Sequence, residues 1–434
     1  MVANRLNQLL EEQRSTSGSN IFGEINLVDN ALHEKSQIKR VAIISEAFLP
    51  KVDGVSKTAY LILRYLQQTG REALVFAPDI AVENVNETQV IRLPSTGSYL
   101  APETRIALPH PTIARNIADF NPDMVLMLSP ALMSVSGMAI ARHLNIPIIA
   151  NYQTDIPGYA HRYGLDFMAG LAWRWLRYIH NGCHLTLIPS QTIADDLKAH
   201  GYHRLRLWQR GINLQRFDPA HRNTAMREKL LNGRDPNSLL CVYVGRLAPE
   251  KCVDVLVDVA KLPGVSLTII GDGASREQLE AQFAETDTHF TGYLFGDDLG
   301  AAFASSDAFF FTGAQETFGQ VVQEAMASGL PAVVTSEGGV KHLVHHGETG
   351  FVAAHHPAAF AEAAMWLRDN REGAAKMGIT ARKIAETRPW SALMTELEGY
   401  MQEAYLLNER FKRIYGSTTY HKPVHLPRWR GRQT

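Results

Sequence analysis

Residues 308–329 read AFFFTGAQETFGQVVQEAMASG, an apolar run followed by a polar turn and a second, periodic apolar stretch. The run Ala308–Thr312 predicts a buried strand, and the stretch after Gly319 predicts a helix. Glu316 is expected at or before the start of this helix, and Glu324 inside it. In a regular helix, a separation of eight residues places two carboxylates about two turns apart on one face.

Apolar runs of this kind recur along the chain, separated mostly by amphipathic stretches such as Ser56–Gln68 and Thr112–Phe120. The predicted strands are Val41–Ile44, Ala73–Phe76, Val90–Leu93, Met124–Leu128, Ile146–Ala150, Leu185–Ile188, Leu239–Val244, Ser266–Ile270, Ala308–Thr312 and Ala332–Thr335. Continuous apolar strands alternating with helices are typical of parallel sheets covered on both faces. We therefore predict an α/β protein with two doubly wound domains. Since ligands bind at the carboxyl ends of such strands, domains that face each other would form a cleft.

Changes in composition along the chain predict five regions. They are a polar extension (1–38), a first domain (39–212), a second domain (213–390), a C-terminal helix (391–410) and a basic tail (411–434). From Phe411 onward the chain has six Lys or Arg residues and no acid. The tail is thus either a disordered basic segment or a segment attracted to anionic lipid.

The overall composition excludes several classes of protein. Lys and Arg (43) nearly balance Asp and Glu (44), so the chain lacks the global charge of a nucleic-acid-binding protein. The three cysteines form no CxxC pair, which indicates a reducing compartment without structural zinc. The N-terminus has no apolar core of a secretory signal. The 18-residue stretch Met124–Ala141 carries no charge, but its Ser, Pro and Gly residues favour a strand, a turn and a helix over a membrane span.

Two further turns after predicted strands could hold a diphosphate. Arg246 and Lys251 follow the strand that ends at Val244, and fixed cations there can neutralise a leaving phosphate. Gly271, in a Gly-Asp-Gly turn, follows another strand, and Gly54 lies between a strand and a helix, where backbone can approach a phosphate. The alternatives are a solvated cation pair and simple turn glycines.

The chain around Glu316 points to sugar and phosphate chemistry. Backbone N–H groups of Phe318 to Val321 would be free donors at the helix start, suited to a phosphate. A carboxylate beside them can bind sugar hydroxyls, and one further along can bind a ribose. The alternative is a capping acid followed by a surface acid.

In this order and spacing, GRLAPEK, GDG and ETFGQVVQE resemble the retaining GT-B glycosyltransferases of glycosyltransferase family 4, over roughly Lys39–Tyr405. The segments SEAFLP (45–50), ANYQTDIPGY (150–159) and RGI (210–212) most resemble bacterial GDP-mannose-dependent mannosyltransferases that act on glycolipids. Sulfolipid synthases, which use UDP-sulfoquinovose, are similar as well. The resemblance implies a GT-B fold and transfer of a hexose from a nucleotide-sugar to a lipid or glycolipid acceptor. It also implies that the C-terminal helix (391–410) returns to the first domain.

The resemblance also implies a set of donor-binding residues. They are Gly54, Gly245, Arg246, Lys251, Gly271, Tyr293, Leu294, Glu316, Phe318, Gly319, Gln320, Val321 and Glu324. In this set Arg246 and Lys251 clamp the diphosphate, Glu316 binds hydroxyls of the donor sugar and Glu324 binds the ribose. Tyr293 and Leu294 follow the strand-like stretch His289–Thr291 and fall where the family holds the base through the backbone.

One position departs from the pattern of many family members. Gln153 stands where they have a His, and it cannot carry a proton at neutral pH. The mannosyltransferase-like relatives share Tyr-Gln-Thr-Asp with this chain, so we interpret Gln153 as a feature of that subgroup. Gln153 and Asp155 are therefore candidate catalytic residues beside Arg246, Lys251 and Glu316, with Asp155 on the acceptor side.

No Asp-x-Asp motif follows a predicted strand, so we expect transfer without a metal or other cofactor. Arg246, Lys251 and helix N-terminal amides would supply the stabilising charge. Because no sequence argument places a nucleophilic carboxylate under the anomeric carbon, we expect front-face transfer with retention rather than double displacement.

The segment Pro157–His180 mixes aromatic and basic side chains, as a helix at a membrane interface does. These are Tyr159, Arg162, Tyr163, Phe167, Trp173, Trp175, Arg177 and Tyr178. The alternative is that at least one of the two tryptophans packs in the core. With the basic tail, this segment leads us to expect a cytoplasmic enzyme that contacts an anionic membrane surface.

Two other functions remain open at this point. An NAD(P)-dependent oxidoreductase would have GxGxxG after the first strand, which Ser45–Gly54 does not supply. A non-catalytic sugar-nucleotide sensor would bind a donor without turnover.

Overall fold

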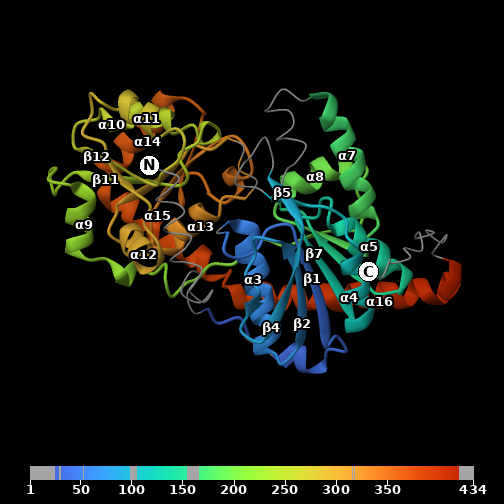
Figure 1. The fold of residues 1–434 in the computed structure, drawn as a ribbon. Helices are drawn as coiled ribbons and strands as arrows, with labels where there is room; N and C mark the ends of the chain where they lie inside the picture. The colour runs from blue at the N-terminus through green and yellow to red at the C-terminus, as the bar shows by residue number, and fades with distance from the viewer. Residues whose placement is uncertain are drawn as a thin grey trace. The chain divides into compact units, whose positions relative to one another are not determined.

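The computed structural model describes residues 25–28, 31–51, 53–97, 105–153, 166–314, 316 and 318–419 of the 434-residue chain. The described residues divide into two compact units (Figure 1). The N-terminal unit comprises those of 30–187, 197–206 and 396–419. The C-terminal unit comprises those of 25–28, 188–196 and 207–395.

The N-terminal unit is built on a sheet of eight strands in the order β10-β9-β8-β7-β1-β2-β4-β3. The strands are β1 (Arg40–Ser45), β2 (Glu72–Pro78), β3 (Asn84–Val85), β4 (Thr88–Leu93), β7 (Met124–Leu128), β8 (Ile148–Asn151), β9 (Leu185–Ile188) and β10 (Leu205–Leu207). The pairings from β9 through β4 are parallel, and β3 is antiparallel to β4. A separate antiparallel pair consists of β5 (Ser95–Gly97) and β6 (Arg105–Ala107).

Helices connect these strands. They are η1 (Ala31–Lys35, a 3₁₀ helix), α3 (Gly54–Gln68), α4 (Pro111–Phe120), α5 (Ser134–His143), α7 (Asp166–Asn181) and α8 (Gln191–Ala199), of which the part up to residue 196 groups with the C-terminal unit. One face of the sheet packs against α4, α5 and α7, whose Ile113, Met138 and Ile179 join the strand residues Ile44 and Val125 in a single core. This packing removes the apolar strands from water, which explains why their sequences are continuous apolar runs.

The C-terminal unit contains a parallel sheet of six strands in the order β13-β12-β11-β14-β15-β16. They are β11 (Leu239–Val244), β12 (Val265–Ile270), β13 (His289–Gly292), β14 (Ala308–Phe311), β15 (Ala332–Thr335) and β16 (Gly350–Ala353). In β11, Leu240 and Val242 enter one core, whereas Cys241 and Tyr243 enter another. The sheet is therefore covered on both faces, as the continuous apolar runs predicted.

The helices of this unit include four 3₁₀ helices. In chain order they are η2 (Pro219–His221), α9 (Thr224–Leu231), η3 (Pro249–Lys251), η4 (Val253–Leu256), α10 (Val257–Ala260), α11 (Arg276–Gln282), α12 (Gly296–Ala304), α13 (Gln320–Ala327), η5 (Val340–His342), α14 (Pro357–Asp369) and α15 (Arg371–Glu386).

The last helix, α16 (Trp390–Thr419), belongs to the C-terminal unit as far as Thr395 and to the N-terminal unit from Glu396 on. Within the N-terminal unit, Glu398 Oε2 accepts hydrogen bonds from Arg71 Nη1 at 2.7 Å and from the Tyr65 hydroxyl at 3.2 Å. The helix extends beyond its predicted end at residue 410. Phe411 packs beside the His184 ring and Lys412 pairs with Glu409, so the first part of the predicted tail is helical.

Each predicted strand has a counterpart in the structure, and the stretch Met124–Ala141 forms β7, a turn and most of α5, as expected. Within the described residues, no helix is both long enough and apolar enough to span a membrane. The short strands β3, β5, β6, β10 and β16 were missed because they lack a long apolar run. Residues 1–24 and 420–434 lie outside the described part of the chain.

Candidate functional site

The strand order of the C-terminal unit reverses between β11 and β14. β12 and β13 lie to one side of β11, whereas β14, β15 and β16 lie to the other. Loops that leave the two strands at such a reversal diverge, and ligands of doubly wound sheets bind there, at the carboxyl ends of the strands.

Two predicted donor-binding residues meet at this reversal. Lys251, in the turn after β11, donates from Nζ to Oε2 of Glu316, which follows β14, at 2.9 Å. The Thr312 hydroxyl donates to the Lys251 carbonyl oxygen at 2.7 Å, which ties the two loops together. Lys251 Nζ also lies 5.7 Å from the centre of the Phe311 ring. A cation and a carboxylate are thus held side by side at the position expected for a ligand.

The Glu316 carboxylate is ionised because of its neighbours. Burial by itself raises its pKa, but the charge and hydrogen bond of Lys251 and the charge of Arg210 outweigh burial and hold the pKa below its usual value. The Phe318 N–H stabilises the same charge. An ionised carboxylate only accepts hydrogen bonds, which suits the binding of sugar hydroxyls.

Arg210 contributes to this site, although its role was not predicted from the sequence. Its guanidinium lies 6.0 Å from the centre of the Phe318 ring, and its charge acts on Glu316. The loop that carries Arg210 is held by Gln320, whose Nε2 donates to the Gly211 carbonyl oxygen at 3.0 Å. No local pattern reveals these contacts, since the partners are far apart in the sequence.

Arg246 is held differently from Lys251. Its Nη2 pairs with Glu250 Oε1 at 2.5 Å in the same loop, and half of its side chain is exposed (51%). The predicted clamp of two cations therefore remains a prediction. An exposed pair of this kind contributes little energy, so a diphosphate could replace Glu250 as the partner of Arg246.

Glycines shape the loop edge beside Arg246. A Cβ at Gly271 would lie 1.9 Å from the Gly245 carbonyl oxygen, and one at Gly273 would lie 2.2 Å from the Leu247 carbonyl oxygen. The loops after β11 and β12 approach this closely because Leu247 N–H donates to the Asp272 carbonyl oxygen at 2.9 Å. The glycines of the Gly-Asp-Gly turn are therefore required for the packing of these two loops. This is the role of simple turn glycines, which was the alternative to diphosphate binding.

The helix α13 begins at Gln320, so Glu316 lies before the helix and Glu324 inside it, as predicted. Gly319 adopts a left-handed conformation (φ 80°) directly before Gln320. Because no single regular helix contains both glutamates, the spacing of eight residues does not place their carboxylates on one helix face. Glu324 is buried in α13 (9% exposed). The first N–H groups of a helix, here those of Gln320 and Val321, have no acceptor within it and are suited to an anion.

The loop after β13 presents two aromatic rings. Tyr293 and Phe295 stack with ring centres 5.6 Å apart, and both are exposed. The Tyr293 hydroxyl donates to the Asp272 carbonyl oxygen at 2.7 Å, so the pair lies beside the Gly-Asp-Gly turn. Leu294 packs against the core instead. Phe295 was not predicted, although an exposed aromatic residue in such a loop is a detectable signal.

The predicted site residues of the N-terminal unit also lie in segments that follow strands of the sheet. Gly54 is the first residue of α3, and the preceding Asp53 caps this helix by accepting the Ser56 N–H at 2.8 Å. Gln153 lies just after β8 and is partly buried. Asp155 lies outside the described residues.

Glu46 is a further carboxylate that the motifs did not single out. It follows β1, and its Oε1 accepts the Ala131 N–H at 3.0 Å, the Ser134 N–H at 3.2 Å and the Ser134 hydroxyl at 3.1 Å. Since β7 ends just before these residues, Glu46 links the two loops where the strand order of this sheet reverses. Burial raises the pKa of Glu46 to about 7. Its place directly after an apolar strand was the signal that could have identified it.

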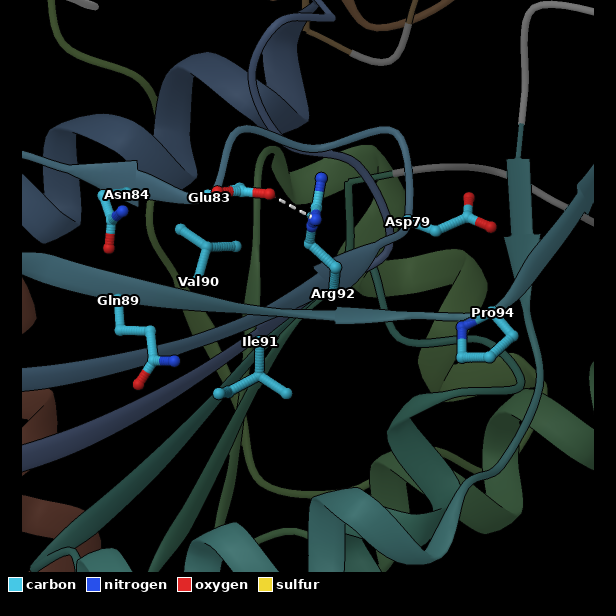
Figure 2. Close-up of a pocket in the computed structure, with 8 residues that line it drawn as sticks. All are labelled: Asp79, Glu83, Asn84, Gln89, Val90, Ile91, Arg92 and Pro94. Carbon is cyan, nitrogen blue, oxygen red and sulfur yellow. Dashed lines mark hydrogen bonds and ion pairs between the residues drawn. The ribbon is translucent and has the colours of Figure 1, made fainter.

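A hollow of about 600 Å³ lies elsewhere on the N-terminal unit, along β4. Figure 2 shows that its Arg92 is paired with Glu83. Asp79, which also lines the hollow, accepts hydrogen bonds from Ser95 and Arg105. None of the motif residues lines it, and we assign it no part in the chemistry.

Comparison with known proteins identifies the family. Residues 52–216 match the family Glycosyltransferase Family 4, and residues 225–384 match Glycosyl transferases group 1. A GDP-mannose-dependent alpha-mannosyltransferase of Mycobacterium tuberculosis (strain CDC 1551 / Oshkosh) is 38% identical over 84% of this chain and 96% of its own length. The chain belongs to glycosyltransferase family 4.

A further relative agrees on the class of reaction, and a solved structure agrees on the fold. Sulfoquinovosyl transferase SQD2 of Arabidopsis thaliana is 34% identical over 88% of this chain and 76% of its own length. The crystal structure of Anabaena HepE in complex with UDP superposes with a TM-score of 0.69 over 84% of this chain and 99% of that one, at 18% identity. The fold is therefore GT-B with two Rossmann-like domains, and the protein is a hexosyltransferase that uses a nucleotide-sugar donor.

Proposed function

We propose that this glycosyltransferase moves an α-mannosyl group from GDP-mannose to a lipid or glycolipid acceptor. The contact between Lys251 and Glu316 carries the proposal, because it holds a cation for the diphosphate and an acceptor for sugar hydroxyls at the strand reversal. The mycobacterial relative named for GDP-mannose supports the choice of donor. The stacked rings of Tyr293 and Phe295 offer a flat surface of the kind on which nucleobases stack.

The proposed transfer proceeds on one face of the sugar and without a metal. The bond between the anomeric carbon and the GDP oxygen breaks as the acceptor oxygen forms a bond to that carbon. The acceptor proton passes to the leaving phosphate oxygen, so charge and atoms balance. Lys251 and Arg246 stabilise the diphosphate that develops, while Glu316 holds the sugar. A product with inverted anomeric configuration, detected by NMR, would overturn this mechanism.

A calorimetric panel tests the donor. GDP, UDP, ADP and GDP-mannose are titrated into the full chain, each with and without EDTA. We expect GDP and GDP-mannose to bind most tightly and EDTA to change nothing. Loss of affinity in EDTA would contradict metal independence, and absence of any nucleotide binding would contradict the whole site.

A UDP-sugar donor is the alternative, favoured by the similarity to the sulfoquinovosyl transferase. The same panel distinguishes the two donors. Tighter binding of UDP than of GDP would indicate a UDP-sugar donor, with sulfoquinovose or glucose as the transferred sugar in place of mannose. Donor binding without transfer to any lipid would leave a sugar-nucleotide-binding protein.

The exposed face of α7 supports a lipid acceptor. Leu171, Trp175 and Tyr178 are exposed (67%, 37% and 57%), and Arg174 and Arg177 are exposed among them. This is the composition of a helix that lies in a membrane interface, with basic side chains at the headgroups.

Trp173, on the same helix, behaves differently. It stacks on His200 with ring centres 3.7 Å apart, so this tryptophan packs against the protein, although it is only partly buried and does not belong to the core.

Flotation with vesicles tests membrane association, which we place at the cytoplasmic face. The full chain should float with vesicles that contain anionic lipid and remain behind with neutral ones. A Trp175→Ser/Tyr178→Ser variant should lose flotation, whereas Ile379→Ser, at an exposed apolar position of the C-terminal unit (58% exposed), should keep it. Equal flotation with anionic and with neutral vesicles would contradict the proposal.

A further inference from the structure

A small crevice opens in the N-terminal unit where β8, β9 and β10 begin. These are the amino-terminal ends of the strands, whereas Glu46 follows the carboxyl end of β1 in the same parallel sheet. The crevice has a volume of about 80 Å³. Its walls include Arg142, His184, Arg204, Asn408, Phe411 and Lys412.

Three cations from three different segments line this crevice. Arg142 is in the last turn of α5, Arg204 precedes β10, and Lys412 is on α16. No acid is among the described residues that line it. The nearby Glu409 pairs with Lys412 at 2.8 Å, whereas Arg204 is held by uncharged carbonyl groups.

Arg204 is oriented by neutral partners. Its Nη2 donates to the Asn181 carbonyl oxygen at 2.6 Å and to the Cys183 carbonyl oxygen at 2.9 Å, and its Nε donates to the latter at 3.2 Å. These carbonyl groups fix the guanidinium without cancelling its charge, and its Nη1 takes no part in these bonds. A positioned arginine with an available edge is a common means of binding phosphate.

The pKa of His184 responds to the positive charges that line the crevice. Burial lowers its pKa, and the charges of Arg204, Arg142 and Lys412 lower it further, to about 4. Its Nδ1 accepts the Ile148 N–H at 3.0 Å, so the imidazole is neutral and cannot itself serve as a fourth cation. An anion in the crevice would offset the three charges and raise the pKa of His184.

We propose that this crevice binds a phosphoryl group. The cations select a compact anion, and a volume of about 80 Å³ admits a phosphate but not a sugar nucleotide. The phosphoryl group can belong to a soluble phosphate compound or to a phospholipid headgroup. The site is separate from the proposed function, which uses the carboxyl ends of the strands.

An NMR titration with inorganic phosphate tests the proposal on the full chain. The protein carries 17 histidines, so the His184 signal is assigned with a His184→Gln variant. We expect saturating phosphate to raise the pKa of His184 by about 1 unit. Phosphate that binds elsewhere on the chain leaves this signal unmoved. An Arg142→Gln/Lys412→Gln variant should weaken the response at least about tenfold, and Lys198→Gln, an exposed lysine in the same unit, should leave it unchanged.

Vesicles distinguish the two sources of phosphate. Phosphatidylcholine vesicles with phosphatidylglycerol are compared with phosphatidylcholine alone, for the wild type and the same variants. Loss of binding to the charged vesicles in the double variant assigns the site to a headgroup. A response of His184 to phosphate with unchanged vesicle binding assigns it to a soluble compound. If neither phosphate nor charged vesicles move the His184 pKa, the proposal is overturned.

Discussion

Glu316 and Glu46 each follow a central strand of a parallel sheet, yet their surroundings shift their pKa values in opposite directions. Burial raises the pKa of both carboxyl groups. Around Glu316, Lys251 and Arg210 outweigh burial, whereas Glu46 meets only neutral N–H and O–H donors and its pKa rises to about 7. The nature of the hydrogen-bond donors, rather than burial, decides which carboxylate is charged at neutral pH.

Lys251→Gln tests the pair at the strand reversal. Without the ammonium group, burial dominates and the pKa of Glu316 rises, so the acidic limb of the pH profile of kcat should move to higher pH. We also expect kcat to fall by about 10²-fold or more, because a charge that stabilises the diphosphate is lost. Lys261→Gln, an exposed lysine of the same unit, is the control. An unshifted acidic limb would show that Glu316 does not depend on Lys251.

Glu46→Gln tests the raised pKa through stability. The folded carboxyl group has a pKa of about 7 against an ordinary value of 4.5, so the folded state binds more protons between these values. The free energy of unfolding of the wild type should therefore fall as the pH rises through this window. Glutamine still accepts the three hydrogen bonds and carries no charge, so the variant should be more stable above pH 7. Urea unfolding at several pH values measures this, and parallel curves for the two proteins would refute it.

At the scale of elements, local pattern predicted the strands but not the contacts between loops. Apolar runs located β11 and β14, and polar residues at their ends located Lys251 and Glu316. The two residues are 65 positions apart, and only the strand order brings them together. The pairing of Arg246 with Glu250 and the left-handed conformation of Gly319 depend on side-chain and turn geometry that spacing does not reveal.

Gly271→Ala tests the close approach of the loops after β11 and β12. The new Cβ would lie 1.9 Å from the Gly245 carbonyl oxygen, so the backbone must shift. We expect a loss of roughly 1–3 kcal/mol in the free energy of unfolding and weaker binding of the donor nucleotide. Gly399→Ala in α16 is the matched control, since its Cβ meets nothing within 4 Å, and it should gain about 0.5–1 kcal/mol. Equal effects of the two substitutions in urea unfolding would contradict this account.

At the scale of the whole molecule, the two units are not two uninterrupted stretches of chain. Residues 188–196 group with the C-terminal unit and residues from Glu396 on with the N-terminal unit. The sequence predicted two doubly wound domains and a helix that returns to the first of them. It could not reveal the buried pair of Arg71 and Glu398, because a charged residue in an amphipathic stretch is ordinarily solvated.

Arg71→Met tests how firmly α16 is held. The variant leaves the Glu398 carboxylate buried without its cation, which costs about 3–5 kcal/mol. The double variant Arg71→Met/Glu398→Met should recover much of this loss, because neither charge is then buried. A double-mutant cycle in urea measures the coupling. Single and double variants of equal stability would show that the pair contributes nothing.

The path of α16 also determines the order in which the two units can finish folding during synthesis. Arg71 is buried against Glu398, a residue 327 positions later, so the ribosome must add all of the intervening residues before this partner exists. Domains usually fold as they emerge, beginning with the N-terminal one. Here the half that is made first acquires its last helix only after the other half has been synthesised, and it therefore finishes folding second.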